Sequence, residues 1–185
     1  NGAKKPYIVF GQGVILGQAE ELLKAVIEKT GIPAAWTILG LSALPSDHPL
    51  NVGMLGMHGN YGPNILTNEC DVLIAIGMRF DDRVTGNLAT YAKQAKVIHF
   101  EIDPAEVDKN VKTDVAVLGD VKESLAGLLL LVEVKSQEAW HNEVKEKYKT
   151  ELESVINDEL KPKGEGISMG ETIEMINKHS NGDDI

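Results

Sequence analysis

The sequence of 185 residues has very little cysteine: Cys70 is the only one, so no disulfide bond can form within the chain. A single cysteine is typical of proteins in a reducing compartment, and we therefore expect a cytoplasmic location. The five histidines show no ligand-like spacing. With one cysteine and no histidine pattern, the sequence has no recognisable metal motif, and we assign no metal ligands.

Basic residues are also scarce. There are 18 Lys and Arg against 28 Asp and Glu, which gives a formal net charge of -10 and a pI near 4.9. This balance argues against nucleic acid as a partner, because phosphate backbones need a basic surface. It leaves room for a local basic pocket that binds one anionic ligand.

Long apolar runs are missing as well. No run approaches the roughly 18 residues that would span a bilayer, so we expect no membrane partner. No signal peptide is visible at the start, and beginning on Asn1 rather than Met suggests a processed or excised piece. The sequence also lacks a Walker loop, a G-x-S-x-G elbow and a clear pair of acid and base carboxylates, so we assign no catalytic residue.

What is present is an alternation of apolar runs and helical stripes. Strands are expected at residues 7–10, 34–39, 72–76, 97–102 and 115–118, and helices at 19–27, 62–69 and 121–132. Residues 40–53 contain two prolines and are interpreted as a loop. Strands that alternate with helices predict an α/β domain with a mainly parallel sheet. The order of the strands cannot be read from this pattern.

The character of the chain changes near residue 133. Residues 1–133 are expected to form one domain, and 134–185 a helical linker followed by the truncated start of another domain. Lys and Glu interleave after this point around a narrow apolar stripe that includes Trp140, Val144 and Tyr148. Ser168 and Glu171 predict a capping box for a second helix. We expect these helices to find no partner within the chain and to be mobile or docked on a neighbour.

The first strand is followed by a glycine turn. Gly11, Gly13 and Gly17 spell G-x-G-x-x-x-G, which is not the dinucleotide fingerprint G-x-G-x-x-G. The second strand carries Thr37 where that fingerprint would have an acidic residue. The turn is therefore equally consistent with a phosphate cradle and with a tight turn of structural importance only.

Charged residues follow the strand at 72–76. Arg79 and Arg83 lie beside Asp81 and Asp82, at the edge of the sheet where parallel strands deliver ligand contacts. We expect one of these arginines to bind an anion. The alternative is a solvated network of surface ion pairs, which mixed charges usually form. At the end of the next strand, Glu101 is either an acceptor for ribose hydroxyls or a charge near a helix N-terminus.

A loop flanked by glycines holds His58, which is more often packed than catalytic. Met54, Met57 and Met78 are suited to a flat aromatic ligand or, more commonly, to filling a core. From spacing and composition alone, the chain has a nucleotide-type ligand site and no identifiable reaction.

Four phrases in order make the pattern specific: M-L-G-M-H-G at 54–59, R-F-D-D-R-V-T-G at 79–86, I-D-P-A-E at 102–106 and G-D-V at 119–121. Over residues 6–131 the sequence resembles the middle domain of acetohydroxyacid (acetolactate) synthase catalytic subunits. The resemblance implies a Rossmann-like, three-layer domain with a six-stranded parallel sheet that binds FAD in a structural role. It also implies a parent enzyme that uses thiamine diphosphate and magnesium to join two 2-keto acids, pyruvate with pyruvate or 2-ketobutyrate, in branched-chain amino acid biosynthesis.

The resemblance carries over residue by residue. It assigns the FAD diphosphate to Gly11, Gln12 and Gly13, although family members often have glycine where this chain has Gln12. It assigns the flavin end to Thr37, Ile38, Leu55, Gly56, Met57 and His58. It assigns the ribityl and phosphate region to Gly77, Met78, Arg79, Phe80 and Asp81, and the adenosine half to Glu101, Ile102, Asp120 and Val121. Met57, Asp82 and Arg83 match positions that line the family's substrate channel.

The same resemblance implies that this chain lacks the catalytic parts. The family's activating glutamate and its G-D-G…N-N thiamine motif belong to other domains, and no G-D-G occurs here. The isolated chain is therefore expected to be inactive. The expected partners are the other domains, a second catalytic subunit and a small regulatory subunit, in the bacterial cytoplasm.

Three alternatives stay open at this point. A sirtuin-like deacylase shares the sheet type but normally has a zinc module of four cysteines. Another thiamine-dependent 2-keto acid decarboxylase would use the same domain without FAD. A non-enzymatic adenine-nucleotide-binding or assembly domain is the third.

Overall fold

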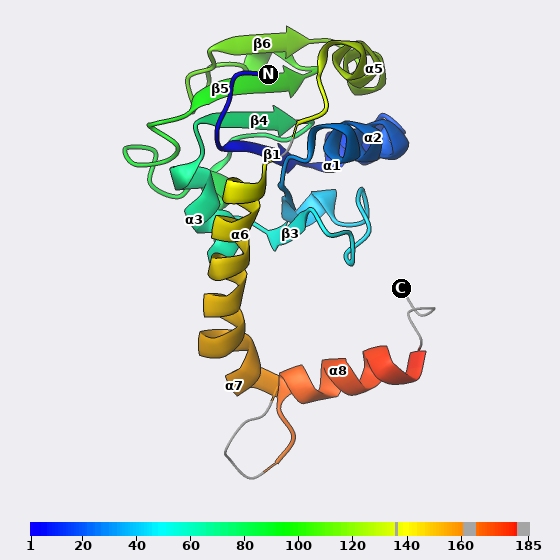
Figure 1. Ribbon diagram of the computed structural model, residues 1–185, viewed down its shortest axis with the longest axis vertical. Coiled ribbons are helices and arrows are strands. Elements are labelled where there is room, and N and C mark those ends of the chain that lie inside the picture. The colour runs from blue at the N-terminus through cyan, green and yellow to red at the C-terminus, as the bar shows by residue number, and fades with distance from the viewer. Residues whose placement is uncertain (136, 161–165, 181–185) are drawn as a thin grey trace.

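The computed structural model describes residues 1–135, 137–160 and 166–180. Its centre is a six-stranded, fully parallel sheet in the order β3-β2-β1-β4-β5-β6 (Figure 1). The strands are β1 (Pro6–Phe10), β2 (Ala34–Trp36), β3 (Asn51–Met54), β4 (Val72–Ile76), β5 (Lys96–Glu101) and β6 (Val115–Leu118). The expected three-layer α/β fold with a six-stranded parallel sheet is confirmed.

Helices cover both faces of this sheet. The helices of the described residues are α1 (Gln12–Leu16), α2 (Glu20–Thr30), α3 (Tyr61–Glu69), α4 (Asp82–Thr85), α5 (Val121–Leu131), α6 (Glu138–Glu151), α7 (Asn157–Leu160) and α8 (Met169–Ser180), of which α7 and α8 lie away from the sheet (Figure 1). Shorter turns are η1 (Ile38–Gly40), η2 (Pro104–Glu106) and the π-helical η3 (Leu152–Ile156). Helices α2 and α5 pack together on one face, and α3 and α6 on the other (Figure 1).

The central strand β1 shows how the sequence builds two cores. Successive side chains of a strand point to opposite faces. Tyr7 and Val9 therefore join the core under α3 and α6, whereas Ile8 and Phe10 join the core under α2 and α5. All five residues of β1 are buried, so this strand is apolar throughout rather than alternating.

The strand order reverses between β1 and β4. The chain runs outward from β1 through β2 to β3, and then returns to place β4 on the other side of β1. In open α/β sheets, ligands bind beyond the carboxyl ends of the strands at such a reversal. A ligand is therefore expected to bind at the loops that follow β1 and β4.

Three local expectations are wrong. Residues 40–53 do not form only a loop, because β3 begins at Asn51 and pairs with β2. The second strand ends at Trp36, and η1 follows. Pro63 is the third rather than the first residue of α3. Each error lies at or next to the short edge strand, where half-buried residues give no clear apolar pattern.

The expectation that the helix after residue 135 has no partner in the chain is also wrong. Trp140 is buried in the core under α3, and its indole N–H donates to the carbonyl of Pro6 at 2.8 Å. Val144 packs against the same core. Lys147 pairs with Glu69 of α3 at 2.8 Å. Helix α6 is thus docked on the sheet domain, while the domain boundary near residue 133 stays a prediction.

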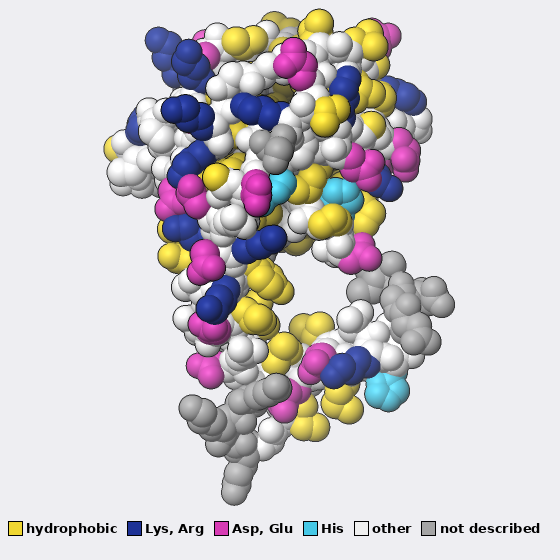
Figure 2. Space-filling model, in the orientation of Figure 1, with side chains coloured by type: hydrophobic (Ala, Val, Ile, Leu, Met, Phe, Trp, Pro, Cys, Tyr) yellow, Lys and Arg dark blue, Asp and Glu magenta, His cyan; other side chains and the backbone are white. Residues whose placement is uncertain are grey.

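The last described helix, α8, lies at the far end of α6 (Figure 1). Its expected capping box is confirmed, because Glu171 N–H donates to Ser168 Oγ at 3.0 Å and Ser168 N–H to Glu171 Oε2 at 2.8 Å. Hydrophobic side chains are visible on its surface (Figure 2). Both Ile173 and Ile176 of this helix are exposed. Among the described residues, no helix combines the length and apolar character that crossing a membrane requires.

Candidate functional site

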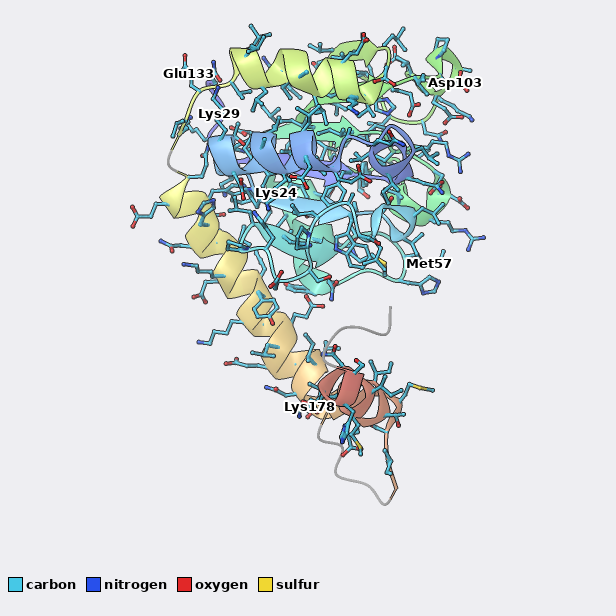
Figure 3. The ribbon with its side chains drawn as sticks, turned by 90° about the vertical axis from the view of Figure 1, so that its right-hand side faces the viewer. Lys24, Lys29, Met57, Asp103, Glu133 and Lys178 are labelled. Carbon is cyan, nitrogen blue, oxygen red and sulfur yellow. The ribbon has the colours of Figure 1, made fainter. Side chains whose placement is uncertain are left out.

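A cavity of about 560 Å³ lies at the carboxyl edge of the sheet, where β1 and β4 end. This volume falls in the range of small-molecule sites, roughly 300–1,000 Å³. Figure 3 shows Met57 and Asp103, which follow β3 and β5, at this end of the domain and Glu133 at the opposite end. The cavity is lined by Gln12, Gly13, Leu16, Gly17, Thr37, Ile38, Leu39, Gly77, Met78, Arg79, Asp81, Arg83, Val84, Phe100, Glu101, Ile102, Gly119, Asp120 and Val121.

The floor of the cavity is the contact between two glycine turns. The N–H of Gly13 donates to the carbonyl of Gly77 at 2.8 Å. A Cβ on Gly13 would lie 2.7 Å from Cα of Gly77, and a Cβ on Gly77 would lie 2.8 Å from Cα of Gly13. Gly77 also has φ +57, a conformation that other residues rarely adopt. The turns therefore need glycine for close packing, and the Gly13 amide is already occupied.

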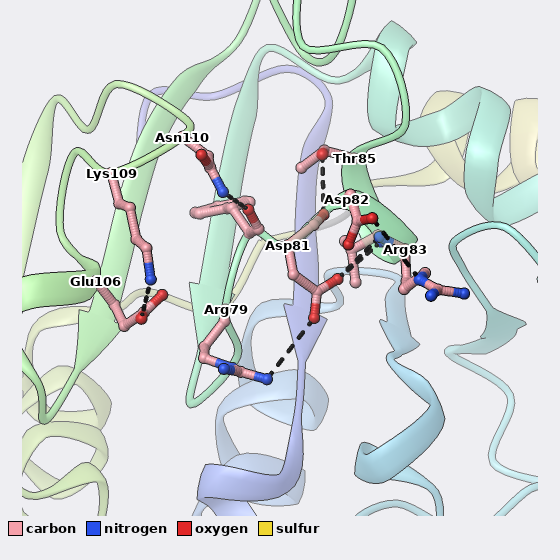
Figure 4. A network of polar contacts seen from close by, with 10 residues as sticks. Arg79, Asp81, Asp82, Arg83, Thr85, Glu106, Lys109 and Asn110 are labelled. Carbon is pink, nitrogen blue, oxygen red and sulfur yellow. Dashed lines mark hydrogen bonds and ion pairs between the residues drawn. The ribbon is translucent and has the colours of Figure 1, made fainter.

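Arg79 supplies a positive charge in the wall. Its side chain is 63% exposed and lies 3.9 Å from Oδ2 of Asp81 (Figure 4). Asp81 is mainly occupied elsewhere, because its Oδ1 accepts the N–H groups of Arg83 and Val84 at 3.1 Å and so begins α4. A long, exposed ion pair of this kind contributes little. The Arg79 guanidinium therefore has donors to offer an anion in the cavity.

Glu101 places a carboxylate on the β5 side. It is 9% exposed, and its Oε1 accepts the N–H groups of Ile102 at 2.9 Å and Asp103 at 3.2 Å. Its Oε2 lies 3.6 Å from Nε2 of His99. The same His99 nitrogen lies 2.9 Å from the carbonyl of Met78, so this fully buried ring connects the Glu101 strand to the turn that carries Arg79.

Asp120 supplies a second carboxylate. Its Oδ1 accepts the N–H groups of Lys122 at 2.9 Å and Glu123 at 3.2 Å, which makes Asp120 the N-cap of α5. Both carboxylates thus use one oxygen for local backbone contacts. The positions of Glu101 and Asp120 in the wall suit them to accept hydrogen bonds from ligand hydroxyl groups.

Large apolar side chains surround the mouth of the cavity. Leu16 is 73% exposed, Ile38 66% and Ile102 72%, although apolar side chains of this size are usually buried. Leu16 lies in α1 and Ile38 in η1, and Ile102 directly follows β5. Exposed apolar side chains gathered at one cavity indicate a ligand with flat or apolar parts.

The residues assigned to a substrate channel lie together beside the cavity. The N–H of Met57 donates to the carbonyl of Arg83 at 2.7 Å, so the loop after β3 rests on α4. Asp82 precedes Arg83 in that helix and pairs with it at 3.8 Å (Figure 4). Met57, Asp82 and Arg83 are thus brought to one place, and their role in a channel stays a prediction.

Some of the predicted site residues do not line the cavity. Gly11 lies behind the wall, where a Cβ would meet Cβ of Met78 at 2.6 Å. Phe80 is buried, with its ring 5.0 Å from that of His99. The loop residues Leu55, Gly56, Met57 and His58 are also outside the wall.

Sequence reasoning assigned no ligand contact to other parts of the wall, namely Leu16, Leu39, Val84, Phe100 and Gly119, and it named Gly17 only as part of the glycine turn. Leu16 had a detectable signal, because it lies four residues after Gln12 and so on the same side of a helix. Leu39 had none, since it was assigned to a strand.

The wall fits the parts of an FAD molecule. A diphosphate needs a cation, which Arg79 offers, and ribose hydroxyls need acceptors, which Glu101 and Asp120 offer. Ring systems need apolar surface, which Leu16, Ile38 and Ile102 offer. By contrast, no cluster of three or more metal-ligating side chains occurs in residues 1–135, 137–160 and 166–180.

The comparison with known families distinguishes between the protein families that the sequence left open. A family model described as "Thiamine pyrophosphate enzyme, central domain" matches residues 1–128. The chain belongs to this family. As a thiamine pyrophosphate enzyme central domain, it is not a sirtuin-like deacylase.

Three proteins similar to this central domain are named as acetolactate synthase large subunits. It is 43% identical to the "Probable acetolactate synthase large subunit" of Methanocaldococcus jannaschii over 165 residues, 86% of this chain and 28% of that protein. It is 40% identical to the "Acetolactate synthase large subunit" of Lactococcus lactis over 183 residues, 99% of this chain and 31% of that protein. It is 50% identical to the protein of the same name from Parasynechococcus marenigrum over 127 residues, 69% of this chain and 21% of that protein. The chain spans less than a third of the length of these relatives.

Proposed function

We propose that this chain is the central domain of an acetolactate synthase large subunit and that it binds FAD in the cavity at the carboxyl edge. The observation that carries the proposal is the composition of the wall: one available guanidinium, Arg79, with two carboxylates, Glu101 and Asp120, and apolar side chains at the mouth. The name shared by relatives that match 69–99% of the chain supports the same conclusion. FAD would have a structural role here and take no part in net redox chemistry.

The activity proposed for the whole protein is the condensation of two 2-keto acids, pyruvate with pyruvate or with 2-ketobutyrate. Thiamine diphosphate and magnesium would be held by other domains, since the sequence has no G-D-G motif. The product would enter branched-chain amino acid biosynthesis in the bacterial cytoplasm. The partners would be those other domains, a second catalytic subunit and a small regulatory subunit.

The test of the ligand is a calorimetric titration of the purified chain with FAD, ADP and riboflavin in turn. We expect FAD to bind more tightly than ADP, and ADP more tightly than riboflavin, because FAD fills both the charged and the apolar parts of the wall. The central domain of a decarboxylase that does not use FAD would gain nothing from the flavin half. Equal affinity for FAD and ADP would therefore favour an adenine-nucleotide-binding domain.

The test of the fragment is an assay for acetolactate. The purified chain, supplied with pyruvate, FAD, thiamine diphosphate and magnesium, is expected to form none. Measurable turnover that copurifies with the chain would contradict the assignment of catalysis to other domains.

A further inference from the structure

The loop of residues 54–60, between β3 and α3, is closed by the backbone and the side chain of one residue, Asn60. The N–H of Asn60 donates to the carbonyl of Met54 at 2.7 Å, and Oδ1 of Asn60 accepts the N–H of Met54 at 3.0 Å. Asn64 holds the middle of the loop, because its side chain accepts the N–H of Gly56 at 2.9 Å and donates to the carbonyl of Gly56 at 3.0 Å. The shape of the loop therefore depends on how the Asn60 side chain is oriented.

Asn60 occupies the N-cap position of α3 but does not cap the helix. An asparagine there usually accepts an N–H of the first turn. The Asn60 oxygen is used on Met54 instead, and no cap hydrogen bond is made by this side chain. Its amide Nδ2 donates to Oε1 of Glu151 at 2.8 Å, and the N–H of Gly62 donates to Oε2 of Glu151 at 3.3 Å. Glu151 of α6 thus takes over the capping role and orients Asn60.

Glu151 is suited to this role by burial and charge. It is only 6% exposed, and a buried carboxylate is costly unless hydrogen bonds satisfy it. Both of its oxygens accept hydrogen bonds, which are stronger because the acceptor is charged. A negative charge at the start of α3 is also favoured by the helix dipole. Docking of Trp140 fixes α6, and so fixes where this carboxylate lies.

The loop that Glu151 orients reaches the candidate site. Met57 is 59% exposed at the tip of the loop, and its N–H donates to the carbonyl of Arg83. A chain of contacts therefore runs from Glu151 through Asn60 and the loop to Arg83. We propose that Glu151 is a positioning residue, which sets the conformation of loop 54–60 and thereby the place of Met57. Only the idea that Met57 borders a substrate channel rests on the proposed function; the positioning rests on the contacts themselves.

The test is amide hydrogen exchange, measured by NMR on the full chain without any ligand. We expect Glu151→Ala to raise the exchange rates of Gly56, Met57 and Gly62 about tenfold or more, because a charge-assisted hydrogen bond is lost. The rates of Leu73 and Ala75 in β4 should stay unchanged. Glu153→Ala is the matched control, since Glu153 is an exposed carboxylate only two residues further on, in η3, and it should change none of these rates.

Conservative variants keep the test decisive. Glu151→Gln retains one oxygen acceptor and should give a smaller increase at Met57 than Glu151→Ala. Asn60→Ala should raise the same amide rates, and adding Glu151→Ala to it should increase the rate of Met57 little further. An unchanged exchange rate of Met57 in Glu151→Gln and Glu151→Ala, or an equal rise at Leu73 and Met57, would overturn the proposal.

If Glu151→Ala does not fold, the exchange rates in Glu151→Gln and Asn60→Ala are sufficient to test the proposal. Because no FAD is used, a failure of FAD binding leaves this result intact.

Discussion

Gly13 and Gly77 are in direct backbone contact: the N–H of Gly13 donates to the carbonyl of Gly77 at 2.8 Å, with no space for a Cβ on either residue. This contact joins the turns after β1 and β4 at the place where the strand order reverses. The glycines that suggest a phosphate cradle in the sequence thus have a packing role. Ligand selection in the cavity would depend mainly on side chains around them.

This contact predicts the effect of Gly13→Ala. The added methyl group would overlap the Gly77 backbone, so we expect a loss on the order of 2 kcal/mol in the free energy of unfolding. Gly127→Ala is the control, because Gly127 lies in α5 with open space around it and should give a gain of about 0.5–1 kcal/mol. Urea unfolding followed by circular dichroism measures both. Similar changes in the two variants would contradict the packing role.

Arg79→Ala should weaken FAD binding roughly ten- to a hundredfold, the cost of one charge-assisted hydrogen bond to a phosphate. The free energy of unfolding should change by less than about 0.5 kcal/mol, since the pair with Asp81 is long and exposed. Arg83→Ala is the matched control, because the Arg83 side chain is 70% exposed, against 63% for Arg79, and pairs with Asp82 in the same way. Quenching of flavin fluorescence measures the affinities. Equal, small losses for both variants would mean that Arg79 is not the anchor.

Replacement of His99 is predicted to destabilise the turn after β4, which carries Met78 and Arg79. In His99→Leu the buried Met78 carbonyl loses its partner, which should cost about 1–3 kcal/mol in the free energy of unfolding. His99→Gln keeps an N–H donor and should lose less. The control is Tyr91→Phe, because the Tyr91 hydroxyl is buried without a hydrogen-bond partner among the described residues. A loss in Tyr91→Phe as large as that in His99→Leu would point to packing alone.

The buried thiol of Cys70 predicts that the free energy of unfolding depends on pH. Burial and the neighbouring Asp71 carboxylate raise the pKa of the Cys70 thiol from 9.0 to about 12. The unfolded chain therefore loses this proton at lower pH than the folded chain does. The contribution of the protonated thiol to the free energy of unfolding is complete below pH 9 and is lost as the pH rises from 9 towards 12. Labelling of native protein by iodoacetamide at pH 8 should be negligible, because the thiolate is the nucleophile. Rapid labelling without unfolding would contradict the burial of Cys70 under α3 and α6.

The sequence predicts the bounds of β4 and β6 correctly, for a physical reason. Residues 72–76 and 115–118 were expected as strands with the bounds that the structure has, because fully or largely apolar runs between turn residues identify them. Asn51–Met54 could not be identified in this way, since it is an edge strand of half-buried residues that includes Asn51 and Gly53. The docking of Trp140 was missed because its partner is a backbone carbonyl, that of Pro6, 134 residues away.

The candidate site was partly accessible to sequence reasoning. Arg79, Glu101 and Asp120 were found because each lies at the end of a strand or just after one, where a parallel sheet gathers its ligand contacts. Glu151 had no such signal, because it lies in a charged helix, α6, in which half of the residues are Lys or Glu. Only the fold shows that this carboxylate is buried.

The most direct measurement is an NMR titration of the isotopically labelled chain with FAD. We expect saturable shifts of the amide signals of Gln12, Thr37, Arg79, Ile102 and Val121, which surround the 560 Å³ cavity. The amides of Asp47, His48 and Lys145, which line a separate cavity of about 340 Å³ beside α6, should not shift. Shifts confined to that second cavity, or no shift at a millimolar concentration of FAD, would contradict FAD binding at the carboxyl edge of the sheet.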